Sequence, residues 1–330
     1  MSFACTSLII KDADQRIYHG RTLEFMVDYP SYLTYYPKGS VFNNIDPDGL
    51  QGLQYTAKYN ILCITMPAFS SEDRSVIEGM NNAGLSFSAN MYALSQTPPL
   101  KQEEYKQALP LVKIGSWGLA LFQSVNEVKQ ALLNQPVWSP ALPLFENSQC
   151  PFHFIFYDKT GKSIVVEYTK GELHIYDNPT GVLTNAPEFS WHLTNMHNYT
   201  MLTNKDSIAS TELGSLSLQE PDIGNATAGL PADDTSVGRF VRGVFYTSYA
   251  LKAQSSDMAI IELSHIMNKF DRPKNMTVGL NGKTEYTEWT SLSDLERGHL
   301  YVRTYRELNY TKYSLSDYES ENIFYSKQLI

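Results

Sequence analysis

The feature that most constrains the fold of this chain is a cysteine at the very start of a predicted β-hairpin. Cys5 leads into the apolar run at residues 8–10, and residues 5–25 form two strands around a polar turn at residues 11–15. If residues 1–4 were removed, Cys5 would carry a thiol and a free α-amine. That amine, with an ordinary pKa of about 7.7–8.0, could act as the base for the thiol. A cysteine in this place is more often a small buried hydrophobic residue, so both interpretations stay open here.

The remaining strand and helix signals predict a layered α+β protein. Apolar runs bounded by turn residues predict further strands at residues 32–36, 59–66, 84–92, 153–157, 163–168, 172–176, 284–289 and 299–308. Helical patterning is expected within residues 103–134, most clearly at 125–133, and at residues 239–253 and 257–268. Residues 200–235 are rich in Ser, Thr, Gly, Asp and Pro and form a long excursion, typical of a functional or assembly element. Strands, then helices, then strands again favour a single layered domain.

Charge and cysteine content exclude several classes of protein. The 330 residues carry a formal net charge of −9, which argues against nucleic acid as a partner because phosphate binding needs a basic surface. No apolar stretch approaches the roughly 18 residues that span a bilayer. The three cysteines show no CxxC spacing and the chain has no HExxH motif, so neither a disulfide framework nor a metal site is indicated. We therefore expect neither a metal nor an organic cofactor.

Five short segments carry a likeness to a known family. They are residues 5–7 (CTS), 20–25 (GRTLEF), 78–85 (EGMNNAGL), 184–195 (TNAPEFSWHLTN) and 229–242, which end in SVGRFVR. In this order and spacing the chain resembles the choloylglycine hydrolase family of bile salt hydrolases and penicillin V acylases, which are N-terminal nucleophile hydrolases. The resemblance spans nearly the whole chain. It implies a four-layer αββα sandwich of two antiparallel sheets over residues 5–330, preceded by residues 1–4 as a leader or propeptide remnant.

The resemblance also implies a hydrolase of linear C–N amide bonds with Cys5 as its nucleophile. The Cys5 thiolate would attack the amide carbonyl, and water would then hydrolyse the thioester. Arg21 matches the family arginine beside the nucleophile, where a fixed positive charge favours the thiolate. Glu24 stands where most family members carry an Asp that bonds the nucleophile's amine, and its side chain is one methylene longer. Arg239 matches the last family arginine, which supports the nucleophile pocket.

The resemblance places two oxyanion donors on other segments. Asn185 matches the asparagine whose side-chain N–H points at the developing oxyanion, and a backbone N–H of the strand near residues 90–92 supplies the second donor. Met91 takes the position where family members carry Asn or Tyr. Asn90 or Tyr92 would substitute for it if the strand is shifted by one residue.

The acyl half of the substrate is expected in an apolar pocket. We place the walls of this pocket in the loops after the early strands, at residues 26–29, beginning with Met26, and at residues 69–71, beginning with Phe69. Among small-molecule acyl amides, conjugated bile salts and penicillin V rank close together as substrates. N-acyl homoserine lactones are the alternative.

Two other interpretations remain open from the residues alone. A papain-like Cys-His-Asp arrangement could draw on His153, His174 or His192, but no local signature supports it. A binding protein of the same fold, inactive because residues 1–4 are never removed, is the non-enzyme alternative.

Assembly and location follow from the resemblance. It implies a homotetramer in which residues 200–235 extend as an assembly element. It also implies a bacterial protein. Residues 2–4 (SFA) have the small-x-small form that precedes a signal-peptidase cut. The protein would be periplasmic or secreted if a signal peptide is removed, and cytoplasmic otherwise.

Overall fold

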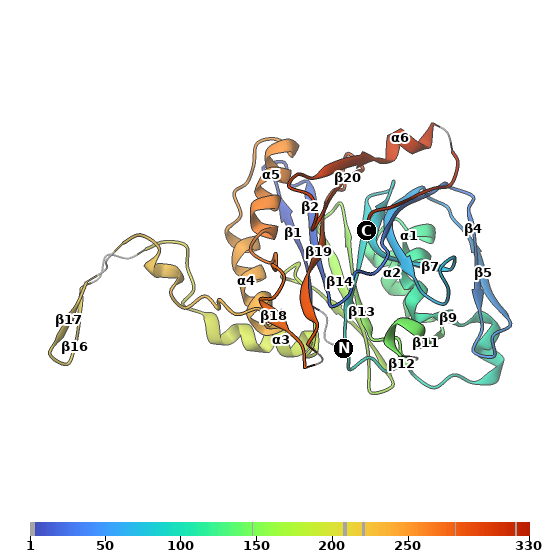
Figure 1. Cartoon of the computed structure of the whole chain (residues 1–330), viewed down its shortest axis with the longest axis horizontal. Helices are drawn as coiled ribbons and strands as arrows, with labels where there is room; N and C mark the ends of the chain where they lie inside the picture. Colours follow the sequence, from blue (N-terminus) through green and yellow to red (C-terminus); the bar gives the residue numbers. More distant parts are fainter. Residues whose placement is uncertain (1–3, 147, 207–209, 220–221, 281, 321) are drawn as a thin grey trace.

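Two antiparallel β-sheets are stacked face to face in the computed structural model, which describes residues 4–146, 148–206, 210–219, 222–280, 282–320 and 322–330 (Figure 1). The first sheet has the strand order β1–β2–β19–β20–β21, and β18 pairs with β19. Its strands are β1 (Cys5–Lys11), β2 (Ile17–Phe25), β18 (Thr277–Val278), β19 (Thr284–Asp294), β20 (His299–Thr304) and β21 (Thr311–Ser314).

The second sheet is larger and has the order β15–β14–β13–β8–β7–β6–β3–β22. Its strands are β3 (Tyr32–Tyr36), β6 (Ile61–Pro67), β7 (Arg74–Asn81), β8 (Leu85–Met91), β13 (Phe152–Asp158), β14 (Ser163–Thr169), β15 (Glu172–Asp177) and β22 (Tyr325–Gln328). Five of its inner strands are buried along nearly their whole length because both faces of the sheet are covered: β6, β7, β8, β13 and β14.

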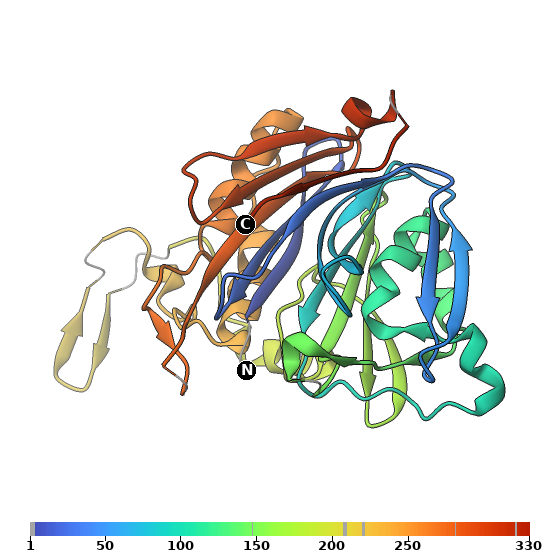
Figure 2. The same cartoon turned by 45° about the vertical axis from the view of Figure 1, so that its right-hand side comes forward.

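Helices cover the outer face of each sheet. Helix α4 (Ser236–Tyr249) packs on β1, and α5 (Ser256–Met267) packs on β2 and β19. On the second sheet, α1 (Ile114–Leu121) packs on β7 and β8, and α2 (Val125–Leu132) on β13 and β14. Figure 2 shows α1 and α2 beyond the second sheet, with the β4–β5 hairpin further out. This helix–sheet–sheet–helix order confirms the predicted four-layer α+β sandwich.

Shorter elements complete the described chain. The remaining helices are α3 (Phe189–Asn195), α6 (Leu315–Glu319) and the 3₁₀ turns η1 (Gln102–Gln107), η2 (Leu111–Lys113), η3 (Pro143–Phe145), η4 (Met196–Tyr199) and η5 (Asn225–Thr227). The remaining strands form the pairs β4 (Val41–Ile45) with β5 (Gln51–Thr56), β9 (Leu109–Pro110) with β10 (Val137–Trp138), β11 (Ala141–Leu142) with β12 (Ser148–Gln149), and β16 (Thr211–Leu213) with β17 (Leu216–Leu218). None of the helices in the described part of the chain combines the length and apolar character needed to cross a membrane.

The first hairpin confirms the sequence prediction and sets the position of Cys5. Strands β1 and β2 pair antiparallel with Cys5 opposite Leu23, so the cysteine lies at the end of the hairpin farthest from its turn. Strand β2 is buried at all nine positions because α5 covers one face and the second sheet the other. Gly20 allows this close approach, since a Cβ there would lie 2.8 Å from the Met267 side chain.

Several predicted boundaries differ from the structure. Helix α4 begins at Ser236, three residues before the predicted start, because the Thr235 hydroxyl caps it by accepting from the Gly238 N–H. Strand β19 continues to Asp294, five residues beyond the predicted strand, since it is paired on both sides by β2 and β20. Within the predicted excursion at 200–235, the β16–β17 hairpin extends away from the sandwich in Figure 1. Of the predicted leader, residues 1–3 lie outside the described residues.

Candidate active site

Cys5 begins β1 and is almost completely buried. Its thiol lies 3.6 Å from Arg21 Nη2, and 2% of the residue is exposed. Burial raises the pKa of the Cys5 thiol above its ordinary value. The positive charge of Arg21 and a backbone hydrogen bond from Met91 act in the opposite direction and favour the thiolate. The cysteine thus has its charged partner in place inside a dry environment.

Arg21 reaches from the first sheet across to the second. Its Nη1 donates to the Ile77 carbonyl at 2.6 Å, and its Nη2 donates to the Ala89 carbonyl at 2.5 Å. The guanidinium also lies over the Trp289 ring, 5.1 Å from the ring centroid. Because two main-chain carbonyls and an aromatic ring fix the guanidinium, its charge is held beside the Cys5 thiol without depending on a flexible partner.

Asn185 and Arg239 hold the main chain of Cys5. The Cys5 N–H donates to Asn185 Oδ1 at 3.0 Å, and Arg239 Nη2 donates to the same oxygen at 2.7 Å. Arg239 Nη1 donates to the Cys5 carbonyl and, at 2.8 Å, to the Thr6 hydroxyl. Burial lowers the pKa of Arg239 to about 10, so its guanidinium remains charged near neutral pH. The structure therefore brings Asn185 and Arg239, which are far apart in sequence, together at the main chain of Cys5.

Glu24 lies on the same side as Arg239, fully buried on β2. Its Oε1 accepts from the Thr287 hydroxyl at 3.0 Å, whereas its Oε2 has no hydrogen-bond partner among the described residues. Burial raises the pKa of Glu24 to about 7, although the charges of Arg272 and Arg239 lower it in part. The Glu24 carboxyl is therefore poised to change its protonation state near neutral pH.

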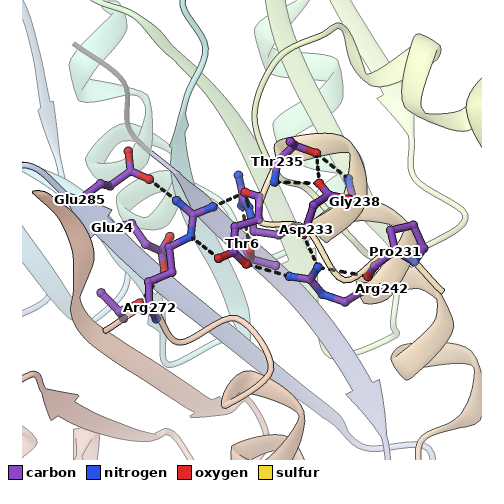
Figure 3. A network of polar contacts seen from close by, with 12 residues as sticks. Thr6, Glu24, Pro231, Asp233, Thr235, Gly238, Arg242, Arg272 and Glu285 are labelled. Carbon is purple, nitrogen blue, oxygen red and sulfur yellow. Dashed lines mark hydrogen bonds and ion pairs between the residues drawn. The ribbon is translucent and has the colours of Figure 1, made fainter. Parts of the chain in front are cut away.

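Two residues that sequence reasoning missed extend this network. Arg272 pairs with Glu285 on β19, and its backbone N–H donates to the Thr287 hydroxyl at 2.8 Å. Figure 3 shows Glu24, Arg272 and Glu285 gathered beside Thr6, with Arg242 continuing the network through the backbone oxygens of Pro231 and Asp233. No local motif marks Arg272 or Glu285. Glu285 lies on β19, and Arg272, in the segment after α5, is bound to that strand by two backbone hydrogen bonds with Thr287.

The three candidates on β8 differ in where their side chains lie. Met91 hydrogen-bonds to the Cys5 thiol through its backbone, and its side chain borders the cavity beside the cysteine. Asn90 instead donates to the Thr184 carbonyl at 2.9 Å and accepts from the Ser7 hydroxyl. Tyr92 hydrogen-bonds to the Thr169 hydroxyl at 2.9 Å and stacks on His153. The strand is therefore not shifted, and Met91 occupies the position facing the cysteine.

An apolar cavity of about 40 Å³ lies beside the Cys5 thiol. Besides Cys5, Arg21, Glu24 and Ser75, its walls are the side chains of Leu23, Phe25, Met66, Pro67, Ala68, Ile77, Ala89, Met91, Val112, Leu142, Leu144, Phe145 and Phe152. Most of these residues come from both sheets and from the segment between α2 and β13, while Val112 comes from η2 and Ala68 follows β6. The cavity can take an apolar group whose reactive end meets the thiol.

Met26 and Phe69 are not among the residues that line this cavity, which corrects the predicted position of its walls. Their neighbours Phe25 and Ala68 line it instead. Phe25 is the last residue of β2 and is 4% exposed, whereas Met26 lies beyond the strand and is only partly buried. The Phe69 ring lies 5.8 Å from Lys113 Nζ, outside the lining.

A second, polar cavity lies on the other side of Met91. Its lining comprises Ala4, Met91, Ala93, Asn185, Ala186, Asp234, Thr235, Ser236, Arg239, Arg272, Thr277 and Glu285. Charged side chains of both signs face it, in contrast to the apolar cavity. Within the described ranges, no group of three or more His, Cys, Asp or Glu side chains is arranged to hold a metal ion.

Comparison with known proteins identifies the family. The linear amide C–N hydrolases of the choloylglycine hydrolase family match residues 5–323 of this chain. A bile salt hydrolase/transferase of Clostridium perfringens is 30% identical over 331 residues and covers 98% of each chain. Another of Lactiplantibacillus plantarum is 30% identical over 322 residues, covering 94% of this chain and 92% of the relative. The chain belongs to the choloylglycine hydrolase family.

Solved structures agree with this assignment. A conjugated bile acid hydrolase from Clostridium perfringens superposes with a TM-score of 0.85 at 28% identity, covering 99% of this chain and 96% of the other. A penicillin V acylase from Agrobacterium tumefaciens superposes with a TM-score of 0.77 at 20% identity, covering 98% and 91%, and so shares the fold. The protein is therefore an enzyme of the N-terminal nucleophile hydrolase fold that hydrolyses linear amides.

Proposed function

We propose that Cys5 is the nucleophile of this hydrolase and that the apolar cavity binds the acyl half of the substrate. The observation that carries this proposal is the position of the Cys5 thiol, which lies against Arg21 at the wall of that cavity. The thiolate attacks the amide carbonyl, the amine leaves with a proton, and a thioester forms. Water then attacks the thioester and releases the acid and the free thiol.

The oxyanion of each step is bound by Asn185 and by the backbone N–H of Met91. The Asn185 side-chain N–H donates at 2.9 Å to the Met91 carbonyl, so the two groups already lie together next to Cys5. A substrate oxygen entering between them would take over the Asn185 donor. One such donor contributes about 2.7–4 kcal/mol to the stability of the transition state.

The base of the reaction is the α-amine of Cys5, which is released when the bond to Ala4 is cut. Both ends of this peptide bond are held in the intact chain. The Ala4 carbonyl accepts from the Glu24 backbone N–H at 3.0 Å, and the Cys5 N–H donates to Asn185. Once free, the amine lies beside Asn185 Oδ1, and its ordinary pKa of about 7.7–8.0 suits proton transfer at neutral pH. In this state the Glu24 carboxyl supports the amine from β2.

Conjugated bile salts are the proposed substrate class. The curated relatives that align over almost the full chain are described as bile salt hydrolases, whereas a Pectobacterium atrosepticum penicillin V acylase is 24% identical over 74% of this chain. The apolar lining of the cavity beside Cys5 suits a hydrophobic acyl group, and the polar cavity beyond Met91 suits a charged amine half.

A side-by-side substrate panel tests this proposal. Glycine- and taurine-conjugated bile salts, penicillin V and an N-acyl homoserine lactone are each incubated with the purified wild-type chain and with Cys5→Ala. We expect the highest kcat/KM for a conjugated bile salt and no product from Cys5→Ala. Preference for penicillin V would contradict conjugated bile salts as the substrate class. Turnover by Cys5→Ala would contradict Cys5 as the nucleophile.

The assembly state and the cellular location are further parts of the proposal. The β16–β17 hairpin carries the exposed side chains of Leu213, Leu216 and Leu218, which suit burial between subunits of a homotetramer. Light scattering on the wild type and on a variant with serine at these three positions tests this, since the variant should dissociate. Fractionation of a bacterial host distinguishes a periplasmic or secreted protein, which a signal peptide would produce, from a cytoplasmic one.

A further inference from the structure

A group of buried polar side chains fills the space between the two sheets directly behind Arg21. Its members are His19 on β2, Glu78 on β7, Ser86 and Ser88 on β8, and Ser291 on β19. Each of them is 0% exposed, and the proposed reaction uses none of them. Polar groups in the interior of a sandwich are costly unless they are paired, so their arrangement calls for a specific explanation.

Glu78 lies at the centre of this group and faces Arg21. Its Oε2 lies 3.9 Å from Arg21 Nη1 and accepts a hydrogen bond from the Ser88 hydroxyl. Its Oε1 lies 3.3 Å from His19 Nδ1. The His19 ring hydrogen-bonds to Ser86 at 3.3 Å and to Ser88 at 3.1 Å. Burial and the charge of Arg21 lower the pKa of His19 to about 3, so the imidazole is neutral at working pH.

The other ionisable groups that face Glu78 are also neutral. Burial raises the pKa of Cys63 on β6 and of Tyr157 on β13 well above their ordinary values. Strands β8 and β19 contribute hydroxyl groups, of which Ser88 and Ser291 favour the ionised carboxyl. Burial nevertheless raises the pKa of Glu78 to about 8, with Arg21 acting in the opposite direction. Arg21 is thus the charge with which Glu78 interacts, and both Glu78 protonation states are accessible near neutral pH.

We propose that Glu78 is a positioning residue of the reaction and that, through Arg21, it sets how much positive charge the Cys5 thiolate meets. This inference rests on the proposed role of Cys5. The guanidinium lies between two acids, with the Cys5 thiol 3.6 Å from Nη2 and the Glu78 carboxyl 3.9 Å from Nη1. A neutral Glu78 leaves the charge of Arg21 to the thiolate, whereas an ionised Glu78 shares it and makes the thiolate less favourable.

The pH dependence of Cys5 alkylation tests this inference. Iodoacetamide is reacted with the full chain from pH 5 to 10, and modification of the Cys5 peptide is followed by mass spectrometry in wild type and Glu78→Gln. We expect the midpoint for Glu78→Gln to lie about one pH unit below that of wild type, because glutamine cannot take up negative charge. A purely structural role predicts the reverse, since a displaced Arg21 would no longer favour the thiolate. An unchanged or raised midpoint would overturn the inference.

Two further variants keep the test decisive if Glu78→Gln folds poorly. Ser88→Ala removes a donor to the Glu78 carboxylate, so the carboxyl holds its proton more tightly and the midpoint should again fall. Glu78→Asp keeps the titrating group and should return the midpoint towards wild type. Asp294→Asn is the matched control, because Asp294 is also a fully buried carboxyl paired with an arginine, Arg297, and it should leave the midpoint unchanged.

This readout separates the inference from the proposed function. Alkylation needs neither removal of Ala4 nor a substrate. Amide hydrolysis by Cys5→Ala together with a lowered midpoint in Glu78→Gln would refute Cys5 as nucleophile while supporting its coupling to Glu78. A chain that hydrolyses amides with an unshifted midpoint would refute the coupling alone.

Discussion

Two arginines contact Cys5 from opposite sides, and they do so in different ways. Arg21 meets the thiol and is itself held by two main-chain carbonyls and the Trp289 ring. Arg239 meets the main chain of Cys5 and shares its hydrogen bonds with Thr6 and Asn185. Arg21 lies between the sheets next to the apolar cavity, whereas Arg239 borders the polar one.

This difference separates two tasks that the site must perform. The side of Arg21 determines how easily the thiol ionises, because its charge is fixed in a dry environment. The side of Arg239 holds the backbone of Cys5 against Asn185, the proposed oxyanion donor. Substitutions on the side of Arg21 should therefore change the ionisation of the thiol, and substitutions on the side of Arg239 should change the rate of the chemical step.

The largest effect is expected from Asn185→Ala on the side of Arg239. Loss of the oxyanion donor should lower kcat about 10²–10³-fold while leaving the pH midpoint of Cys5 alkylation within a few tenths of a unit. Steady-state kinetics and the alkylation profile are measured on the same preparation. A large shift of the alkylation midpoint would show that Asn185 also affects the ionisation of the Cys5 thiol, against the division between the two sides.

Arg21→Met should produce the complementary result. Without the fixed charge beside the sulfur, the Cys5 thiol pKa should rise by about 1–3 units, which leaves roughly 10–1,000-fold less thiolate at neutral pH. The rate of amide hydrolysis and the rate of alkylation should then fall together. Full alkylation at neutral pH in this variant would contradict the role assigned to Arg21.

Glu24→Gln should change how the free energy of unfolding depends on pH. The native Glu24 carboxyl, with its pKa raised to about 7, holds a proton that the unfolded chain releases near pH 4.3. Between these values the native chain binds the extra proton, so this group makes the free energy of unfolding fall as pH rises. Glu24→Gln should lack this contribution, which urea unfolding at pH 4.5, 6 and 7.5 measures. If the free energy of unfolding depends on pH equally in the wild type and in Glu24→Gln, the titrating group is not Glu24.

The smallest effect is expected in the wall of the apolar cavity. Phe145→Ala should raise KM for a conjugated bile salt about tenfold, corresponding to about 1.4 kcal/mol of lost apolar contact. Met26→Ala is the matched control because Met26 does not line the cavity. Equal KM changes in the two variants would contradict the cavity as described.

The sequence predicted the elements whose signals are local. The hairpin of β1 and β2, the pair β13 and β14, and helix α2 carry clear alternation or helical spacing, and each was found near the predicted residues. The family and the four-layer fold were likewise confirmed. Strand β22 and the β4–β5 hairpin were missed because their short or polar sequences gain stability from the neighbours on which they pack.

Other parts of the site depend on contacts that no local pattern encodes. Thr287 reaches Glu24 only because β19 pairs with β2, more than 250 residues along the chain. Glu285 lies on the same strand, and Arg272 joins through its backbone hydrogen bonds to Thr287 and its ion pair with Glu285. The walls of the cavity were predicted in the loops at residues 26–29 and 69–71, but Phe25 and Ala68, which precede these loops, line it instead. Which side chain faces inward is set by where a strand ends. The catalytic roles themselves stay predictions.

The central claim is that Cys5 acts as the first residue of the mature enzyme. Intact mass and N-terminal sequencing of the purified wild type, together with its rate of bile salt hydrolysis, test this claim most directly. The account predicts an N-terminus at Cys5 in the active protein. A folded protein that retains Ala4 and still hydrolyses the amide at full rate would contradict it, because a blocked amine cannot serve as the base.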